Sequence, residues 1–289
     1  MQLMEVIWMD NNFIAPRNIS ELSEALRIKT ENTYILAGGT DLNIKLIKDQ
    51  IFDFKIIDIS KLEGFKSIEV NDDVIKIGAC VTMTDIENSE IIKNEIPALV
   101  SAAESVGSTQ IRNRATIGGN LANAAQCGDT IPVLFSYDAD VEILNSAKEI
   151  RHEKVRDFVV GIGKTSLNSD EVITSIIIKR GDYISGFSKV GSRKTVTISK
   201  INCCGKFLLD KDSVVSEAEV YMGAVGVKPI KAELIENELK GKILQDININ
   251  FEDIIKAQIE KFIPNRSSKY YKGIAAIGLI DDLLANLRR

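Results

Sequence analysis

The chain has 289 residues, and its 36 Lys and Arg against 41 Asp and Glu give a formal net charge of -5. This length is enough for two domains or three subdomains. The slight acidic excess gives no support to nucleic acid or an anionic membrane surface as a partner. No apolar run reaches the roughly 20 residues that a membrane-spanning helix needs, and the first residues lack a charged leader before an apolar block. We therefore expect a cytoplasmic protein.

Protein-borne catalytic and metal chemistry is not expected. The four cysteines show no C-x-x-C spacing, and His152 is the only histidine. Zinc and iron–sulfur sites need clustered thiolates or imidazoles. The sequence contains no G-x-S-x-G or H-E-x-x-H pattern either. If the chain belongs to an enzyme, a bound cofactor must supply the chemistry.

The N-terminal pattern predicts a helix, a strand and a second helix. The first helix covers residues 18–30, with Ser20 as its cap, and the strand over residues 33–37 runs into the turn GGTD. A short helix over residues 42–48 follows. A strand, a glycine turn and a helix start direct several backbone N–H groups toward an anion. A plain β-turn explains the same residues as well.

A second group of elements follows. We expect a strand over residues 54–59 and a hairpin over residues 67–78. Thr84 and Glu87 fit a capping box for a short helix, and another helix starts at Pro97 and ends at Gly107.

Residues 110–129 form a central loop in this interpretation. The stretch has no apolar period, and its paired glycines and short amide and hydroxyl side chains suit backbone that approaches a ligand. Its TIGGNL is similar to the AGGTDL of residues 37–42. The likeness is too short for an internal repeat, but it suggests two glycine loops that converge from two sheets on one ligand.

The remaining pattern predicts strands and then helices. Asp129 can cap a helix over residues 130–137. The segment FVVGIGKT resembles the end of a nucleotide-binding phosphate loop, but the leading glycine of that motif is replaced by Phe158, so we reject the match. A break between domains is expected at residues 181–186. Strands are expected over residues 140–144, 149–154, 172–178, 187–190, 199–209 and 214–223, followed by three helices, the last with Ile274, Ile277, Ile280, Leu284 and Leu287 facing the core.

Four ordered segments carry a family resemblance. Residues 35–48 (ILAGGTDLNIKLIK), 111–129 (IRNRATIGGNLANAAQCGD), 157–165 and 186–193 (GFSKVGSR) resemble the FAD-binding medium subunit of the xanthine dehydrogenase, or molybdenum hydroxylase, family. Carbon monoxide and nicotinate dehydrogenases belong to that family. The resemblance implies an α+β chain with a two-subdomain FAD-binding fold of the vanillyl-alcohol-oxidase (PCMH) type, followed by a C-terminal antiparallel sheet with three helices. The implied domains are 1–180, with subdomains of about 1–58 and 59–180, and 181–289.

The resemblance also implies which residues bind FAD. The first glycine turn would wrap the pyrophosphate with backbone N–H groups, and the second would line its other side. Asp129 would bind the adenosine end or adjacent backbone, Ile173 would pack against the flavin, and Lys189 would approach the polar edge of its ring. The residues so implied are Ile35, Leu36, Ala37, Gly38, Gly39, Thr40, Asp41, Leu42, Thr116, Gly118, Gly119, Asn120, Asn123, Asp129, Ile173 and Lys189.

The implied function is electron transfer within a complex. FAD in this chain would receive electrons from [2Fe-2S] clusters on a small subunit, after substrate is oxidised at molybdopterin on a large subunit, and would pass them to NAD(P)+ or another acceptor. Val106 stands where some relatives place a phenylalanine against the flavin, and Gly163 where some place an arginine. A stand-alone flavin oxidoreductase and a flavin-free assembly protein are the alternatives.

Overall fold

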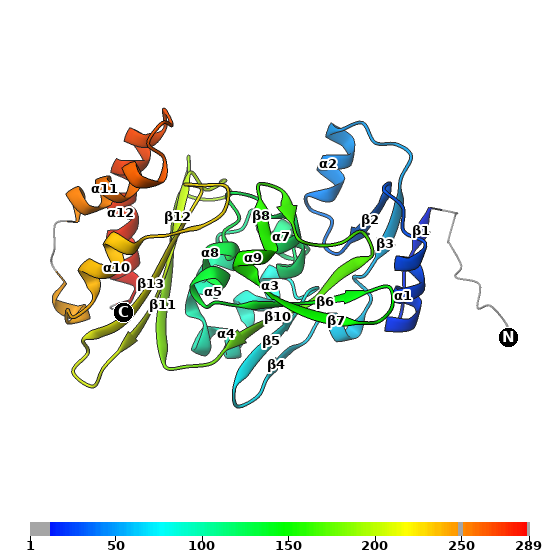
Figure 1. The fold of residues 1–289 in the computed structure, drawn as a ribbon, viewed down its shortest axis with the longest axis horizontal. Coiled ribbons are helices and arrows are strands. Elements are labelled where there is room, and N and C mark those ends of the chain that lie inside the picture. Colours follow the sequence, from blue (N-terminus) through cyan, green and yellow to red (C-terminus); the bar gives the residue numbers. More distant parts are fainter. Residues whose placement is uncertain (1–11, 248–250, 288–289) are drawn as a thin grey trace.

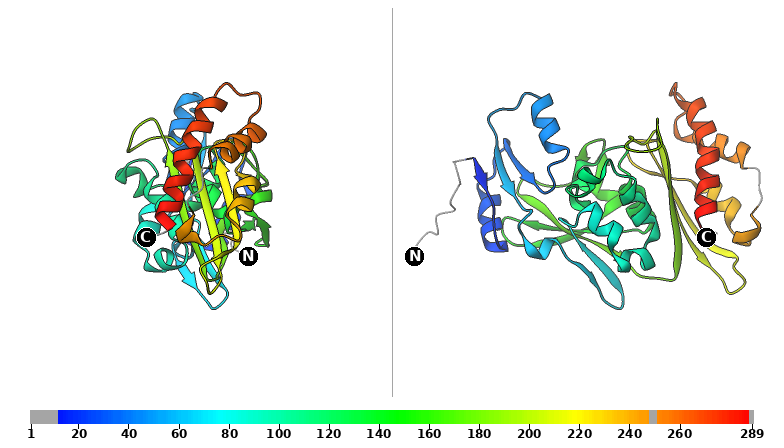
Figure 2. Two further views of the ribbon diagram at one scale, coloured as in Figure 1. Left: turned by 90° about the vertical axis from the view of Figure 1, so that its left-hand side faces the viewer. Right: turned by 180° about the vertical axis from the view of Figure 1, so that it is seen from behind.

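The computed structural model describes residues 12–247 and 251–287, so the first residues, in which no leader was recognised, lie outside the described part. Figures 1 and 2 show three sheets that follow one another along the long axis of the molecule. They have the strand orders β1-β3-β2, β4-β5-β10-β6-β7 and β11-β12-β13-β14. Each sheet is built from one continuous stretch of sequence.

The first sheet is parallel, and two helices accompany it. α1 begins after Asn18, whose side chain accepts from the N–H of Glu21. The prediction that Ser20 caps this helix is therefore wrong, because a better-placed cap residue precedes it by two positions. The elements are β1 (Phe13–Ile14), α1 (Ile19–Arg27), β2 (Thr33–Leu36), α2 (Leu42–Lys48) and β3 (Lys55–Asp58).

The second sheet is antiparallel and has β10 at its centre. Val74–Gly78 pairs with one edge of β10 and Asp140–Asn145 with the other. A two-stranded hairpin lies beside this sheet and contains the segment that resembled a phosphate loop; Gly163 occupies its turn with φ +64°. The strands are β4 (Ile68–Val70), β5 (Val74–Gly78), β6 (Asp140–Asn145), β7 (Ile150–Lys154), β8 (Val159–Gly161), β9 (Lys164–Thr165) and β10 (Glu171–Lys179), with the 3-10 turn η1 (Glu63–Phe65).

Short helices lie between this second sheet and the C-terminal sheet (Figure 1). The capping box is made by Thr82 and Asp85, not by Thr84 and Glu87. The expected central loop contains two helices, because Ser108 and Thr116 each accept a hydrogen bond from the first turn that follows them. The helices are α3 (Met83–Asn88), α4 (Glu90–Glu95), α5 (Pro97–Glu104), α6 (Thr109–Arg112), α7 (Ile117–Asn123), α8 (Thr130–Ser136) and α9 (Val155–Phe158).

The C-terminal sheet is an antiparallel meander covered on one face by three helices (Figure 1). The expected break at 181–186 is shorter than predicted, since Gly186 pairs with Gly205 inside β11. A Cβ at Gly186 would lie 3.1 Å from Leu283, so glycine lets α12 approach the sheet. The elements are β11 (Tyr183–Val190), β12 (Ile201–Leu209), β13 (Val215–Gly223), β14 (Ile230–Lys231), α10 (Glu233–Leu239), η2 (Leu244–Asp246), α11 (Glu252–Phe262) and α12 (Lys269–Leu287).

The helix α12 differs in one respect from its predicted apolar stripe. Ile274 is 70% exposed, whereas Gly273, Ala276 and Leu279 are buried. Apolar residues occur on more than one face of α12, so the sequence alone does not specify which face is buried. In the structure, the face that contains the small residues packs most closely.

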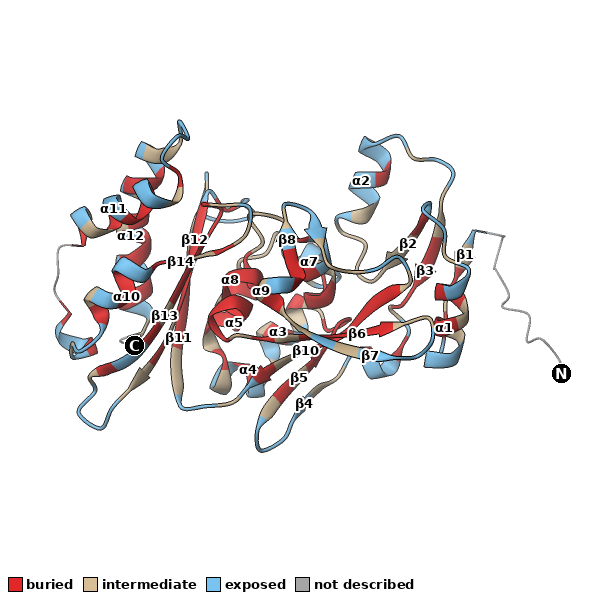
Figure 3. Cartoon of the chain, viewed as in Figure 1, coloured by how far each residue is buried: buried red, intermediate tan, exposed pale blue. Residues whose placement is uncertain are grey.

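The C-terminal sheet separates two cores (Figure 3). Cys203 and Cys204 are adjacent in β12 and, because strand side chains alternate, face opposite cores. Phe187, Cys204 and Tyr221 belong to the same core as the second sheet and its helices. Among residues 12–247 and 251–287, no helix is both long and apolar enough to cross a membrane.

Candidate functional site

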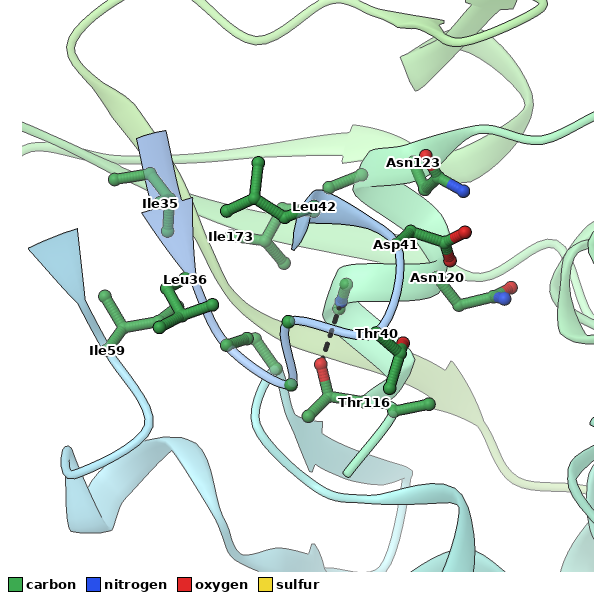
Figure 4. Close-up of a pocket in the computed structure, with 18 of the residues that line it drawn as sticks. Ile35, Leu36, Thr40, Asp41, Leu42, Ile59, Thr116, Asn120, Asn123 and Ile173 are labelled. Atoms are coloured by element: carbon green, nitrogen blue, oxygen red, sulfur yellow. Dashed lines mark hydrogen bonds between the residues drawn. The ribbon is translucent and has the colours of Figure 1, made fainter. Parts of the chain in front are cut away.

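A cavity of about 290 Å3 lies between the first glycine turn and helix α7 (Figure 4). Every residue that the resemblance implied lines this cavity except Asp129 and Lys189. The residues implied by sequence and brought together here are Ile35, Leu36, Ala37, Gly38, Gly39, Thr40, Asp41, Leu42, Thr116, Gly118, Gly119, Asn120, Asn123 and Ile173.

The cavity has an apolar side and a polar side. Figure 4 shows Ile35, Leu36, Ile59 and Ile173 gathered on one side of the glycine turn. Asp41, Asn120 and Asn123 lie together on the other side, as the same figure shows. A ligand with an apolar ring system at one end and a polar chain at the other would match this division.

The first glycine turn offers free donors. Among the hydrogen bonds of the described residues, none is donated by the backbone N–H groups of Gly38, Gly39, Thr40 or Asp41. Gly39 has φ +74°, a conformation that side chains with a Cβ disfavour. A row of unpaired N–H groups at a cavity is suited to the oxygens of a phosphate chain.

The second glycine turn is satisfied internally. Gly118 N–H donates to the carbonyl of Ala79 at 3.0 Å, and Gly119 N–H donates to Thr116 Oγ1 at 3.1 Å. A Cβ at Gly118 would lie 2.6 Å from the Cβ of Ala79. The second pair of glycines therefore allows close packing of protein against protein, and not only the close approach of a ligand.

The two glycine turns touch each other. A Cβ at Gly38 would lie 2.0 Å from the carbonyl oxygen of Arg114, in the segment just before the second turn. Glycine at this position lets the first sheet's turn rest on that backbone. The convergence expected from the sequence is thus direct contact, and the cavity opens beside it.

Asp129 and Lys189 pair with each other outside this cavity. Lys189 Nζ lies 2.7 Å from Asp129 Oδ2; the Asp129 side chain is buried and that of Lys189 is 10% exposed. Asp129 also accepts from Ser199 Oγ at 2.5 Å and from Asn202 Nδ2 at 2.8 Å. Asp129 stands at the cap position of α8 but accepts no capping hydrogen bond, so the cap interpretation is wrong. The pair instead links the loop before α8 to the C-terminal sheet.

A second cavity, of about 710 Å3, adjoins the first. Val106 lines the first cavity, whereas its neighbours Ser105 and Gly107 line the second. Lys189 lines the second cavity too, and its ammonium donates to the carbonyl of Ser105 at 2.8 Å. This larger cavity is rich in hydroxyl and basic groups, which include Arg112, Arg193, Lys194, Ser108, Thr109 and Thr197.

Several lining residues were not recognised from the sequence. Leu167, Glu171 and Val172 form a wall of the first cavity next to Ile173. Two Arg151 hydrogen bonds of 2.8 Å hold the pKa of Glu171 at about 2, well below its usual range. The two residues are far apart in sequence and meet only through the sheet, so no local pattern could identify them.

Among residues 12–247 and 251–287, the remaining reactive side chains form no metal centre. In the described part of the chain, no group of three or more His, Cys, Asp or Glu could hold a metal ion. His152 is half exposed, with Nε2 3.4 Å from Glu142 Oε2, and the four cysteines form no disulfide. Burial raises the pKa of the Cys80 thiol to about 12, which makes it unreactive.

FAD fits the first cavity in its chemistry. The four free N–H groups suit the pyrophosphate, and the apolar side suits a flavin or its attached chain. No protein acid or base is required, because the bound flavin supplies the redox chemistry and the chain orients it.

Comparisons with known proteins support FAD as the cofactor of this chain. Residues 9–179 match the sequence family described as FAD binding domain in molybdopterin dehydrogenase. The chain is 37% identical to the nicotinate dehydrogenase FAD-subunit of Eubacterium barkeri, covering 80% of each chain. It is 29% identical to the xanthine dehydrogenase FAD-binding subunit of Escherichia coli O157:H7, over 89% of this chain and 88% of that one.

A solved structure shows the same fold. Reconstituted CO dehydrogenase from Oligotropha carboxidovorans superposes with a TM-score of 0.83 at 21% identity, over 95% of this chain and 96% of that chain. The predicted fold class and the predicted cofactor, FAD, are thereby confirmed. The chain belongs to the family of FAD-binding domains found in molybdopterin dehydrogenases.

Proposed function

We propose that this chain is the FAD-carrying electron-transfer subunit of a multi-subunit molybdenum hydroxylase. The observation that carries the proposal is the amphipathic cavity between the two glycine turns, with its row of unpaired N–H groups. The similarity to chains named as FAD subunits of nicotinate and xanthine dehydrogenases supports it. A large subunit would carry molybdopterin, and a small subunit would carry [2Fe-2S] clusters.

We further propose that the chain is divided into two structural units. Residues 1–180 would form the flavin-binding unit, with subdomains at about 1–58 and 59–180, and residues 181–289 would form the C-terminal sheet-and-helix unit. All the lining residues of the first cavity lie in the flavin-binding unit. The C-terminal unit contributes Lys189 to the second cavity instead.

The proposed final acceptor of electrons is NAD(P)+. The second cavity supports this choice, because its lining includes hydroxyl and cationic groups that suit a dinucleotide, beside the carboxylates of Glu104 and Asp282. Anaerobic titration of the FAD-loaded protein with NADH and with NADPH, monitored by bleaching of the flavin absorption, tests it. If neither nucleotide reduces the flavin, another acceptor must serve.

A reducing compartment, the cytoplasm, is the proposed location. Four cysteines free of disulfides are consistent with such a compartment. Measurement of the redox state of the cysteines in freshly lysed cells, by alkylation and mass spectrometry, tests this proposal.

A visible absorption spectrum is the experiment that tests the main proposal. The purified chain is measured before and after FAD is added and the protein is desalted, and the released cofactor is identified chromatographically. We expect close to one FAD per chain. If the chain takes up no FAD, either alone or when produced together with its partner subunits, the proposal is wrong and the flavin-free alternative is favoured.

A further inference from the structure

An ion pair between the partly exposed Arg151 and the buried Glu171 supports one wall of the FAD cavity. Arg151 lies on β7 and Glu171 begins β10, with β6 between these two strands. Arg151 and Ile173 both pair with Ile143 of β6, so their side chains share one face of the sheet. Glu171 lies two residues before Ile173 and shares that face. The pair therefore sits on the face that presents Ile173 to the cavity.

The contact between the two side chains is bidentate. Arg151 Nε donates to Glu171 Oε1 and Arg151 Nη2 donates to Glu171 Oε2, each at 2.8 Å. The Glu171 side chain is only 5% exposed. A bidentate pair fixes the relative orientation of two planar groups more strictly than a single hydrogen bond does.

The same arginine holds the segment that leads into the wall. Arg151 Nη2 also donates to the carbonyl of Ser166 at 3.2 Å, and Asn168 N–H donates to Glu171 Oε2 at 2.8 Å. Glu153 accepts from Arg151 Nη1 at 2.6 Å and from Ser166 Oγ at 2.5 Å. The network thus fixes both ends of residues 166–171, between which Leu167 lines the cavity.

We propose that Arg151 and Glu171 are positioning residues for FAD: their ion pair fixes the wall that carries Leu167, Val172 and Ile173. This inference rests on the proposed function of the cavity. Arg151 does not line the cavity itself, and it acts through Glu171 and Ser166. No additional cofactor or reaction step is involved.

Removal of the arginine makes the wall sensitive to pH. With Arg151 present, the pKa of Glu171 stays near 2, so the carboxylate remains charged and paired at pH 5 and above. Without the cation, the largest cause that lowers the pKa of Glu171 is lost, and burial, which raises this pKa, is opposed mainly by the hydrogen bonds from Asn168. The uncompensated charge then disturbs the wall at high pH, and protonation relieves the disturbance as the pH falls.

Other charges around Glu171 do not substitute for Arg151. Glu153 is itself an anion, and the neighbouring Asp170 accepts from Ser146 Oγ at 2.7 Å. Lys45 and Asp41 line the same cavity and carry opposite charges. Loss of Arg151 therefore leaves Glu171 without a cationic hydrogen-bond partner among the described residues.

The test compares FAD affinity across pH in three variants of the full chain. For Arg151→Met we expect FAD to bind on the order of tenfold more weakly than to the wild type at pH 8, and to recover as the pH falls toward 5.5. For Arg151→Met/Glu171→Gln we expect part of the lost affinity to return, so that FAD binds more tightly than to Arg151→Met at pH 8 but still at least about threefold more weakly than to the wild type, without pH dependence. Arg156→Met is the matched control, because Arg156 pairs with Asp138 and donates to Tyr221 away from the cavity.

The readouts are the FAD dissociation constant from flavin fluorescence quenching and the thermal midpoint of the flavin-free protein. If Arg151→Met lowers the midpoint but leaves FAD affinity unchanged, the pair is purely structural and the inference is wrong. A loss in Arg151→Met that is as large at pH 5.5 as at pH 8, and that the second substitution does not reduce, also overturns it. Failure of the wild type to bind FAD would overturn the proposed function instead.

One further variant covers the case in which Arg151→Met does not fold. Glu171→Gln alone keeps Glu153 as a partner of Arg151 but removes the bidentate charge pair. We expect FAD to bind at least about threefold more weakly than to the wild type. Unchanged affinity would overturn the inference.

Discussion

The two glycine turns are alike in sequence and opposite in construction. In AGGTDL, residues 37–42, the backbone N–H groups of the turn are unpaired. In TIGGNL, residues 116–121, the N–H groups of both glycines are already bonded, to Ala79 and to Thr116. The first turn therefore offers hydrogen bonds to a ligand, whereas the second offers a rigid surface.

This difference shows that a glycine pair beside a ligand cavity can serve two purposes. Gly38 and Gly118 stand where any Cβ would collide with neighbouring protein, at Arg114 and at Ala79. Gly39 stands where the backbone conformation itself favours glycine. Gly38 and Gly118, the most crowded glycines of the two turns, bring segments of the protein together, whereas the free donors lie in the first turn only.

Gly38→Ala should have the largest effect on the fold. The new Cβ would lie 2.0 Å from the carbonyl oxygen of Arg114, which is backbone and cannot rotate away. We expect a loss of about 3 kcal/mol or more in the free energy of unfolding, together with loss of FAD. Chemical denaturation of the flavin-free protein measures it, and a near-native stability would contradict the contact between the two turns.

Gly119→Val should abolish FAD retention and leave the fold largely intact. The added Cβ meets only the hydroxyl of Thr116, at 2.8 Å, and a side chain there enters the cavity lining. We expect a stability loss of about 1 kcal/mol. Flavin content after desalting and the circular dichroism spectrum provide the measurement. Unchanged flavin content would show that the second turn does not face FAD.

Gly39→Ala should weaken FAD binding more than it weakens the fold. A non-glycine residue at φ +74° costs about 1–2 kcal/mol, and relaxation of the turn redirects its free N–H groups. We expect roughly tenfold weaker FAD binding by fluorescence titration. If affinity stays at the wild-type value while stability falls, the donors of this turn do not bind the cofactor.

Thr116→Val should have the smallest effect. It removes the hydroxyl that caps α7 and accepts from Gly119 N–H, at a cost of about 1 kcal/mol. Because this turn offers no free donor from its glycines, FAD affinity should change by no more than about threefold. A large loss of affinity would show that the Thr116 hydroxyl binds the cofactor directly.

Local patterns were sufficient for most elements near the first turn. The strand over residues 33–37, the glycine turn and the helix over 42–48 correspond to β2, the free donors and α2. Capping was predicted less well, since Asn18 and Ser20 are both good cap residues and only the folded chain selects one. The helices inside residues 110–129 were missed because each is shorter than two turns.

Cavity residues that lie within continuous sequence motifs could be predicted, whereas residues that only the pairing of strands brings together could not. The family motifs indicated most of the cavity lining, including Ile173. Asp129 and Lys189, which the motifs also assigned to the cofactor, do not line this cavity and form an ion pair with each other, and their role toward FAD stays a prediction. The Arg151–Glu171 pair depends on the register of three strands, which no single segment of the sequence specifies.

The adjacent cysteines in β12 have a consequence for how this protein unfolds. Because Cys203 and Cys204 face different cores, one strand holds two hydrophobic interiors together. Unfolding of the C-terminal sheet would remove Phe187 and Tyr221 from the hydrophobic core that they share with the flavin-binding unit. The chain should therefore denature in one cooperative transition, and residues 1–180 produced alone should expose an apolar wall and aggregate.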